Sequence, residues 1–289
     1  MHYSGSVYRP PSEAYSLIVQ CTLGCSHNKC AFCIMYKDKK FSINPLEQVL
    51  ADLAEARSMY RRIERIFLAD GDALILPMDY LLEVLDFIRR YFPECERVSA
   101  YASTKAILRK TDAELKLLRE RGLAMVYIGL ETGNEALLAK YDKGVTVEQI
   151  VAHTLRAKAA GMITSVTAIN GMGGKELSET HAIDTAAALS RIKPDYIAML
   201  TLRVYTGTPL HEWIERGELT MLSPQELAAE NRILLAHIDS EGSVFRSNHA
   251  SNYLPLKGTL NRDREALIEQ IDRALAGEVR FRRAVELGL

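Results

Sequence analysis

Short runs of β-branched and apolar residues alternate with longer amphipathic runs along most of this chain, and this alternation constrains its fold more than any other feature. Between the short runs, apolar residues recur at helical spacing, as in Leu46, Val49, Leu50 and Leu53. Strands that alternate with helices form parallel sheets with right-handed crossovers. We therefore expect an α/β fold, a partial six-unit barrel or a doubly wound sheet, with strands at residues 15–20, 65–70, 97–102, 125–131, 163–170 and 196–203.

Local start signals place several of the helices. Thr111 and Glu114 have the spacing of a capping box. Ser223, Pro224 and Glu226 mark the start of a later helix. Asn44 stands before Pro45 at the expected start of the first helix. We expect residues 1–14 to be an N-terminal extension and 15–240 the core. The alternation of expected strands and helices ends after about Ser240. We therefore expect residues 241–289 to be a C-terminal extension, too short for a core of its own.

Composition bounds the class of protein. Hydrophobic residues make up 48% of the 289 residues and charged residues 25%, the usual mixture of a globular protein. The net charge of −1 gives no global field that would attract nucleic acid or anionic lipid. No run of about 18 apolar residues is present, and residues 1–11 lack the apolar core of a secretory signal. We expect a cytoplasmic protein with no membrane association.

Four of the five cysteines fall within residues 21–33, directly after the first expected strand. Thiolates are soft ligands that suit zinc or iron–sulfur clusters. Zinc ribbons usually separate two cysteine pairs by about a dozen residues or more, whereas only four residues separate Cys25 from Cys30 here. A single loop can wrap around a larger cluster. Zinc, and a set of buried cysteines without a metal, remain the alternatives at this point.

The run Cys25-Ser-His-Asn-Lys-Cys30-Ala-Phe-Cys33 resembles the signature of the radical S-adenosylmethionine superfamily. That signature has three cysteines spaced by three and then two residues, with an aromatic residue before the last. Here the spacers are four and two residues, Phe32 occupies the aromatic position and Thr22 matches a common lead-in. The resemblance implies a partial (β/α)6 TIM-like barrel and a 4Fe-4S cluster held by Cys25, Cys30 and Cys33.

The ends of the expected strands extend this resemblance. Asp70-Gly71-Asp72 is similar to the Gly-Gly-Glu-Pro segment of the superfamily, although an ordinary turn has the same composition. Ile-Gly-Leu-Glu131-Thr-Gly is similar to a segment of the oxygen-independent coproporphyrinogen oxidases, the tRNA methylthiotransferases and the Elongator catalytic subunit; a glutamate that caps the next helix is the alternative. The resemblance implies that S-adenosylmethionine is bound by Phe32, Asp70, Gly71, Asp72, Ser103, Glu131, Asn170 and Gly171.

Candidates for contact with a substrate lie later in the chain. Arg203 and Tyr205 follow the sixth expected strand, within a segment similar to the Tyr-Pro-Gly-Thr-Pro-Leu of the superfamily. His249 and Asn252 lie in a run dense in hydrogen-bonding side chains that follows the sixth unit, where we expect a lid. Packing on the barrel rim, or a simple turn, is the alternative for each pair.

The resemblance implies an enzyme that cleaves S-adenosylmethionine reductively to a 5′-deoxyadenosyl radical, which takes hydrogen from a substrate. Flavodoxin or ferredoxin is the expected electron donor, and a small molecule is favoured over nucleic acid as the substrate. Two spare cysteines are too few for a second cysteine-ligated cluster. An iron–sulfur electron carrier and a zinc-stapled binding protein are the alternatives from other functional classes.

Overall fold

The computed structural model describes residues 1–287 and divides the chain into two compact units. The first comprises Met1–Asn28, Cys33–Ile128 and Ala152–Thr164. The second comprises Lys29–Phe32, Gly129–Val151 and the described residues from Ser165 onward. Strands β6 (Leu123–Glu131) and β7 (Ile163–Asn170) and helix α6 (Val147–Ala159) each have residues in both units.

Parallel strands form the centre of the first unit. β1 (Leu17–Gln20) pairs with β4 (Arg65–Ala69), β4 with β5 (Arg97–Tyr101) and β5 with β6, all in parallel. Gln20 faces Ala69 and Leu68 faces Ala100 in this register, so the carboxyl ends of the three strands meet at one edge. The residues that follow these strands are therefore brought together.

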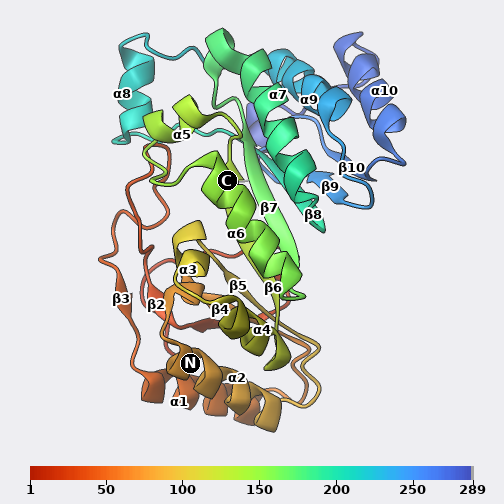
Figure 1. The fold of residues 1–289 in the computed structure, drawn as a ribbon. Coiled ribbons are helices and arrows are strands. Elements are labelled where there is room, and N and C mark those ends of the chain that lie inside the picture. Colours follow the sequence, from red (N-terminus) through yellow and green to blue (C-terminus); the bar gives the residue numbers. More distant parts are fainter. Residues whose placement is uncertain (288–289) are drawn as a thin grey trace. The chain divides into compact units, whose positions relative to one another are not determined.

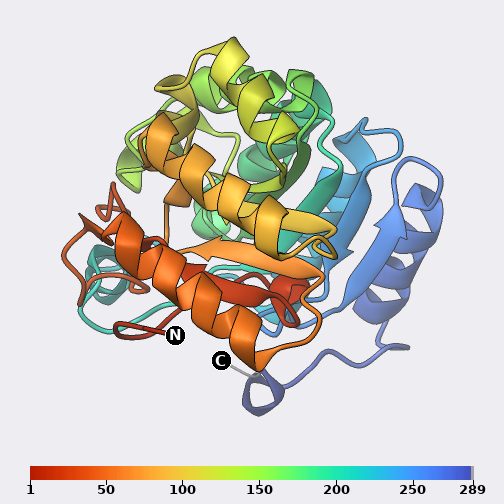
Figure 2. The same cartoon turned by 90° about the horizontal axis from the view of Figure 1, so that it is seen from below.

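Two amphipathic helices cover part of the first unit. α1 (Leu46–Met59) and α2 (Met78–Tyr91) lie side by side in Figures 1 and 2 and bury their apolar stripes. Phe67, Tyr101 and Tyr127 pack edge to face in the core of the sheet. The remaining elements of this unit are η1 (Pro11–Glu13), β2 (Thr22–Leu23), β3 (Ser42–Ile43), η2 (Ala73–Ile75), α3 (Thr104–Leu108) and α4 (Asp112–Glu120).

The second unit continues the pattern and ends in a hairpin. β7, β8 (Tyr196–Thr201) and β9 (Val244–Ser247) pair in parallel in that order, and β10 (Leu256–Thr259) runs antiparallel to β9. Helix α9 (Pro224–His237) lies between α7 (Gly174–Ile192) and α10 (Arg264–Leu275) (Figure 1). The shorter helices are α5 (Glu135–Lys140), α8 (Pro209–Glu215) and η3 (Ala284–Glu286).

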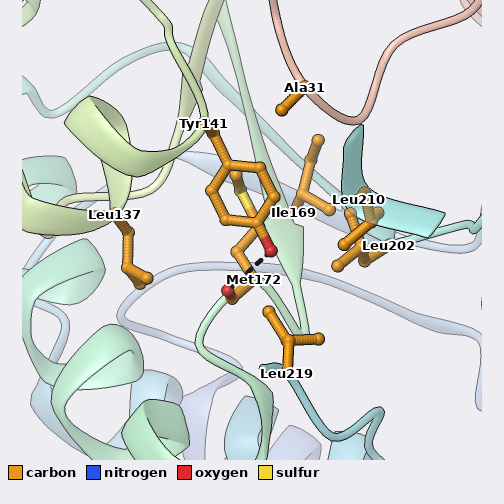
Figure 3. Close-up of a cluster of buried hydrophobic side chains, with 8 residues drawn as sticks. All are labelled: Ala31, Leu137, Tyr141, Ile169, Met172, Leu202, Leu210 and Leu219. Atoms are coloured by element: carbon orange, nitrogen blue, oxygen red, sulfur yellow. Dashed lines mark hydrogen bonds between the residues drawn. The ribbon is translucent and has the colours of Figure 1, made fainter. Parts of the chain in front are cut away.

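A compact apolar cluster surrounds Tyr141 in the second unit. Its buried members come from the cysteine-bearing segment, α5, the end of β7 and the chain around α8 (Figure 3): Ala31, Leu137, Tyr141, Ile169, Met172, Leu202, Leu210 and Leu219. Trp213 and Phe32 pack against the ring of Tyr141 edge to face. This cluster therefore fixes Ala31 and Phe32 relative to the end of β7.

All six predicted strands are present, and the differences lie mainly at element ends and in short elements. The first strand begins at Leu17, since Ser16 donates its backbone N–H to Glu13 and completes a turn there. Asn44 does not cap α1, because its side-chain amide donates to the Gln20 carbonyl instead. The predicted capping box at Thr111 is confirmed, and the predicted helix start at Ser223 is confirmed and also carries a capping box. Strand β10 and helices α3, α5 and α8 were not predicted.

The strands follow the order β1-β4-β5-β6-β7-β8-β9-β10 in a mostly parallel sheet. Helices connect most of the parallel strands, as the alternation in the sequence predicts. Among residues 1–287, no helix is both long enough and apolar enough to cross a membrane.

Candidate functional site

The cysteine loop follows β1 and connects β2 to β3, whose short antiparallel pairing places Thr22 opposite Ile43. Cys25 and Cys33 belong to the first unit and Cys30 to the second, and all three are partly buried. No disulfide joins any of the five cysteines, all of which lie in the described part of the chain. The three thiols are thus carried by one loop at the carboxyl end of a strand.

Hydrogen bonds of Asn28 hold the four-residue spacer between Cys25 and Cys30 in place. Asn28 adopts a left-handed conformation with φ of 46°, which asparagine tolerates better than most residues. Its side-chain amide donates to the carbonyl of Tyr36 at 2.7 Å, and Lys37 donates to the Asn28 carbonyl at 2.8 Å. The extra residue between Cys25 and Cys30 is therefore held in a defined turn.

Within residues 1–287 no three His, Cys, Asp or Glu side chains are grouped around a single metal-ion position.

Asp72, after β4, ties the cysteine loop to the end of β5. Its buried carboxylate accepts hydrogen bonds from the hydroxyl of Ser26, the hydroxyl of Ser103 and the backbone N–H of Ser103. Ser103 in turn caps α3 by accepting the N–H of Ala106 at 3.0 Å. Burial raises the pKa of Asp72, and the bonds from Ser26 and Ser103 oppose that rise. Both oxygens of Asp72 are engaged by the protein.

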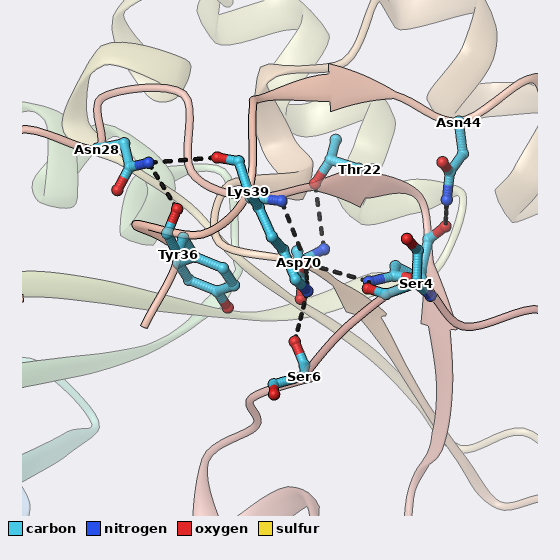
Figure 4. Close-up of polar contacts among 10 residues, drawn as sticks. Ser4, Ser6, Thr22, Asn28, Tyr36, Lys39, Asn44 and Asp70 are labelled. Carbon is cyan, nitrogen blue, oxygen red and sulfur yellow. Dashed lines mark hydrogen bonds and ion pairs between the residues drawn. The ribbon is translucent and has the colours of Figure 1, made fainter. Parts of the chain in front are cut away.

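Asp70 lies two residues before Asp72 and has a different environment (Figure 4). Lys39 donates to its Oδ2 atom at 2.8 Å, and Gln20 and the backbone N–H of Gly24 donate to the same oxygen. Asp70 is fully buried, yet its Oδ1 atom has no hydrogen-bond partner among the described residues. A buried acceptor without a partner costs about 1–3 kcal/mol, so Oδ1 marks a position for a donor from a ligand.

Tyr36 provides a second polar atom of this kind. Its hydroxyl is buried and has no hydrogen-bond partner within residues 1–287. Burial, and after it the charge of Asp70, raises the pKa of Tyr36, so the hydroxyl stays protonated. Gly71 lies between the two features, because a Cβ atom there would be 2.7 Å from the Tyr36 ring and 3.0 Å from the Cβ of Cys25. Only glycine permits this close approach of the β4 turn to the cysteine loop.

In the second unit, backbone bonds hold the segment between Cys30 and Cys33. The N–H of Ala31 donates to the Tyr141 carbonyl at 2.9 Å, and the Ala31 carbonyl accepts the N–H of Leu210 at 3.2 Å. The ring of Phe32 lies 5.8 Å from that of Tyr141, centroid to centroid. The structure thus gives Phe32 a packing contact, and its predicted contact with the cofactor stays a prediction.

Glu131, at the end of β6, forms an ion pair with Lys143 at 2.6 Å. The backbone of Glu131 is left-handed, with φ of 65°, which turns the chain sharply after the strand. Gly129 leaves room for this pair, since a Cβ there would lie 2.0 Å from Oε1 of Glu131. A capping role, the alternative reading of Glu131, is not seen, because Asn134 caps α5.

Asn170 and Gly171 form the turn after β7. Asn170 is buried and its Oδ1 atom has no hydrogen-bond partner in residues 1–287. Gly171 has φ of 87° and donates its N–H to the carboxylate of Glu230 at 2.7 Å. The turn therefore carries an unpartnered acceptor beside a tightly held glycine.

The four residues predicted to contact a substrate lie in the second unit and differ in how strongly the protein already binds their side chains. Arg203 and Tyr205 are partly exposed after β8. His249 is half-buried and bonds to Ser251. Asn252 is buried: its amide N–H groups donate to the Met199 carbonyl and to Ser247, and its oxygen accepts the hydroxyl of Thr201. It therefore joins the loop after β9 to the end of β8. Contact of any of the four with a substrate stays a prediction.

The thiols and polar side chains of this region suit the 4Fe-4S cluster and the S-adenosylmethionine that the sequence implies. Three thiols on one loop are the ligand type of an iron–sulfur cluster. Within the first unit, Asp70 Oδ1 and Tyr36 OH are buried polar atoms that have no partner among the described residues, and they can receive the polar groups of a small ligand. Tyr36 and Lys39 were missed in the sequence because neither belongs to a recognised motif; their place in the loop just after Cys33 was the available signal.

Comparison with known proteins decides the family. A family model described as the Radical SAM superfamily matches residues 19–189, more than half of the chain. The chain belongs to the radical SAM superfamily. The match includes the three cysteines and the strand ends from β1 to β7.

Individual relatives agree with this assignment. The heme chaperone HemW of Bacillus subtilis (strain 168) is 25% identical over 203 residues, which are 69% of this radical SAM chain and 52% of HemW. The chain spans about half the length of the curated relatives it matches.

Solved structures show the same fold. Methylornithine synthase (PylB) aligns with a TM-score of 0.58 at 15% identity, over 89% of this chain and 68% of that one. Coproporphyrinogen III oxidase (HemN) from Escherichia coli aligns with a TM-score of 0.55 at 16% identity, over 76% and 52%. The predicted fold class, an α/β fold of the partial-barrel kind, is confirmed. Radical SAM enzymes use a 4Fe-4S cluster and S-adenosylmethionine, so these cofactors follow from the family.

Proposed function

We propose that this radical SAM protein cleaves S-adenosylmethionine reductively, with an electron from flavodoxin or ferredoxin, and takes a hydrogen atom from a small-molecule substrate. The observation that carries the proposal is the meeting of two features in the first unit. A loop bearing cysteine thiols follows β1, and beside Cys25 lie Asp70 Oδ1 and Tyr36 OH, buried polar atoms that have no partner within residues 1–287. When bound, the cluster and S-adenosylmethionine supply the 5′-deoxyadenosyl radical.

The chain's own residues hold and shield the reaction centre. Cys25, Cys30 and Cys33 provide three thiolates, which leave one iron of a four-iron cluster open for a ligand. Ser26 and Asn28 anchor the loop between the first two cysteines through Asp72 and the Tyr36 carbonyl. These bonds hold the loop between Cys25 and Cys30 through residues that are not themselves metal ligands.

Asp70 and Tyr36 are proposed to bind the polar part of S-adenosylmethionine. The unpartnered Asp70 Oδ1 is suited to an ammonium group, because a buried carboxylate favours a cationic donor. Tyr36 can donate to, or accept from, a neighbouring polar group. On the second unit, Glu131 and Asn170 are the further proposed contacts, with Asn170 Oδ1 as an acceptor for an N–H donor.

On the substrate side we propose Arg203, Tyr205 and His249, with residues 241–289 as an extension that covers the site. Asn252 is proposed to act by holding this extension, because its amide is already engaged by Thr201 and Met199. A net charge of −1 supports a small molecule over nucleic acid, since it provides no general attraction for phosphates.

The test is whether the reduced protein forms 5′-deoxyadenosine. Anaerobically reconstituted wild-type protein, reduced with dithionite and given S-adenosylmethionine, should release 5′-deoxyadenosine slowly even without substrate. The Cys33→Ala protein should release none, because its cluster is incomplete. A fully reconstituted wild-type cluster that yields no 5′-deoxyadenosine with dithionite or with reduced flavodoxin would favour the electron-carrier alternative.

A further inference from the structure

Three hydrogen bonds from separate parts of the second unit hold the turn Asn170–Met172. The Asn170 carbonyl accepts the backbone N–H of Leu202 at 2.9 Å. The Met172 carbonyl accepts the hydroxyl of Tyr141, also at 2.9 Å (Figure 3). The N–H of Gly171, between them, donates to Glu230 Oε1 at 2.7 Å. Each residue of the turn is thus fixed by a partner that is distant in the sequence.

Glu230 is an unusual partner for a backbone N–H. It lies on α9, is 1% exposed, and also accepts the hydroxyl of Ser178 on α7 at 2.6 Å. Within residues 1–287, the group that could form an ion pair with it is His181, whose Nε2 atom lies 3.7 Å away. Burial lowers the pKa of His181 to about 4, so that ring is neutral near pH 7.

A buried carboxyl without a cation is costly, since burial disfavours its charged form. Burial accordingly raises the pKa of Glu230 to about 7, although the bonds from Ser178 and Gly171 oppose the rise. An apolar residue at this position of α9 would avoid that cost. Glu230 therefore has a role other than packing, and the N–H of Gly171 that it binds indicates this role.

Gly171 follows Asn170, whose side chain carries a hydrogen-bond acceptor without a partner in the described residues. Asn170 is 1% exposed, and its Oδ1 atom has no hydrogen-bond partner in the described residues. Buried amide oxygens are nearly always paired, so this atom marks the place of a missing donor. Glu230 controls the peptide between Asn170 and Gly171, because it binds the N–H of that peptide.

We infer that Glu230 is a positioning residue for ligand binding at the β7 turn: by fixing Gly171 it directs the Asn170 amide oxygen to an N–H donor of S-adenosylmethionine. The inference rests on the proposed function, because the ligand is the one proposed there. Glu230 touches the turn and not the ligand. Tyr141, which holds the other end of the turn, acts in the same sense.

Affinity for S-adenosylmethionine alone, measured by calorimetry on the anaerobic, reconstituted protein, tests this inference. Glu230→Ala removes the acceptor and should weaken binding about tenfold or more, the loss expected for one hydrogen bond to a charged group. Glu230→Gln keeps an acceptor oxygen for Gly171 and should bind within about threefold of wild type. Iron content should not change in either variant.

Glu226→Gln is the matched control. Glu226 is one turn earlier on α9, where it completes the capping box with Ser223 and pairs with Lys175 at the surface. Glutamine can complete the same capping box, so affinity and iron content should both match wild type. Unchanged affinity in Glu230→Ala would overturn the inference, as would equal weakening in Glu230→Gln and Glu230→Ala.

If Glu230→Ala does not fold, the pH dependence of binding decides. The wild-type affinity should fall as the pH drops through about 7, because a protonated Glu230 accepts a weaker bond from Gly171. The Glu230→Gln protein should lack this component, with Ser178, His181 and Tyr141 still facing the position. Parallel profiles would overturn the inference. Absence of 5′-deoxyadenosine from a wild-type protein that still binds would instead contradict the proposed function.

Discussion

The hydroxyl of Tyr141 donates a 2.9 Å hydrogen bond to the backbone carbonyl of Met172, and this bond joins the end of α5 to the turn after β7. The backbone carbonyl of Tyr141 accepts the N–H of Ala31 at 2.9 Å. One buried residue therefore links the segment between Cys30 and Cys33 to the turn that is proposed to bind S-adenosylmethionine.

Tyr141→Phe should lower the free energy of unfolding by about 1–3 kcal/mol, because the Met172 carbonyl loses its hydrogen bond. It should also weaken binding of S-adenosylmethionine several-fold with the iron content unchanged. Urea denaturation and calorimetry measure the two effects. Tyr127→Phe is the control: its hydroxyl also bonds within the core, to Glu13 and Ser12, so stability should fall while the affinity stays at the wild-type value.

Alanine at Cys25, Cys30 or Cys33 should abolish the cluster, since two remaining thiolates leave further irons without ligands. Alanine at Cys21 or Cys95 should not. Cys21 is buried beside the sheet and burial raises its pKa to about 12, which disfavours the thiolate. Iron and sulfide assays on the five variants measure the result. A full cluster in Cys30→Ala, or none in Cys21→Ala, would contradict the ligand assignment.

Asp70→Asn should weaken binding of S-adenosylmethionine about tenfold, because the unpartnered Oδ1 loses its charge. Asp52→Asn is the matched control, since Asp52 is also buried but bonds to His2 and Gln48. Equal affinities in the two variants would show that Asp70 does not contact the cofactor.

Asp72→Ala should act differently from Asp70→Asn. It leaves Ser26 and both donors of Ser103 without their acceptor, so we expect a loss of stability of about 1–3 kcal/mol together with weaker binding. Thermal unfolding of the reconstituted protein would reveal the difference. A fully stable Asp72→Ala protein with weakened binding would instead support direct contact of Asp72 with the cofactor.

Glu230 should make stability depend on pH. Its pKa is about 7 in the folded protein against 4.5 for an unperturbed carboxyl, so the folded state holds the proton more tightly. The associated stability is fully present below pH 4.5 and is lost as the pH rises through about 7, by about 3 kcal/mol in total. His181, whose pKa is lowered, contributes with the opposite sign between pH 4 and 6.5.

Glu230→Gln isolates the glutamate from the histidine. The stability of this variant relative to wild type should increase between pH 5 and 8, because glutamine does not ionise. Urea unfolding at a series of pH values measures the difference. A constant difference across this range would show that Glu230 does not titrate there.

Local signals in the sequence determined much of this protein. The alternation of strand-like and helix-like runs placed six strands. The capping box at Thr111 and the helix start at Ser223 formed as predicted, because each depends on residues only a few positions apart. The cysteine loop together with the ordered motifs at the strand ends predicted the family, which the match over residues 19–189 confirmed.

Tertiary structure alone decided what the polar residues around this loop do. Asp70 and Asp72 stand two positions apart in one motif, yet Asp72 is fully bonded and Asp70 keeps an open oxygen. Their partners, Lys39 and Ser103, come from segments about 30 residues away in opposite directions along the chain. Glu230 is separated from Gly171 by 59 positions. No local pattern in the sequence records such pairings, because burial and contact arise only when the parallel strands bring their carboxyl ends together.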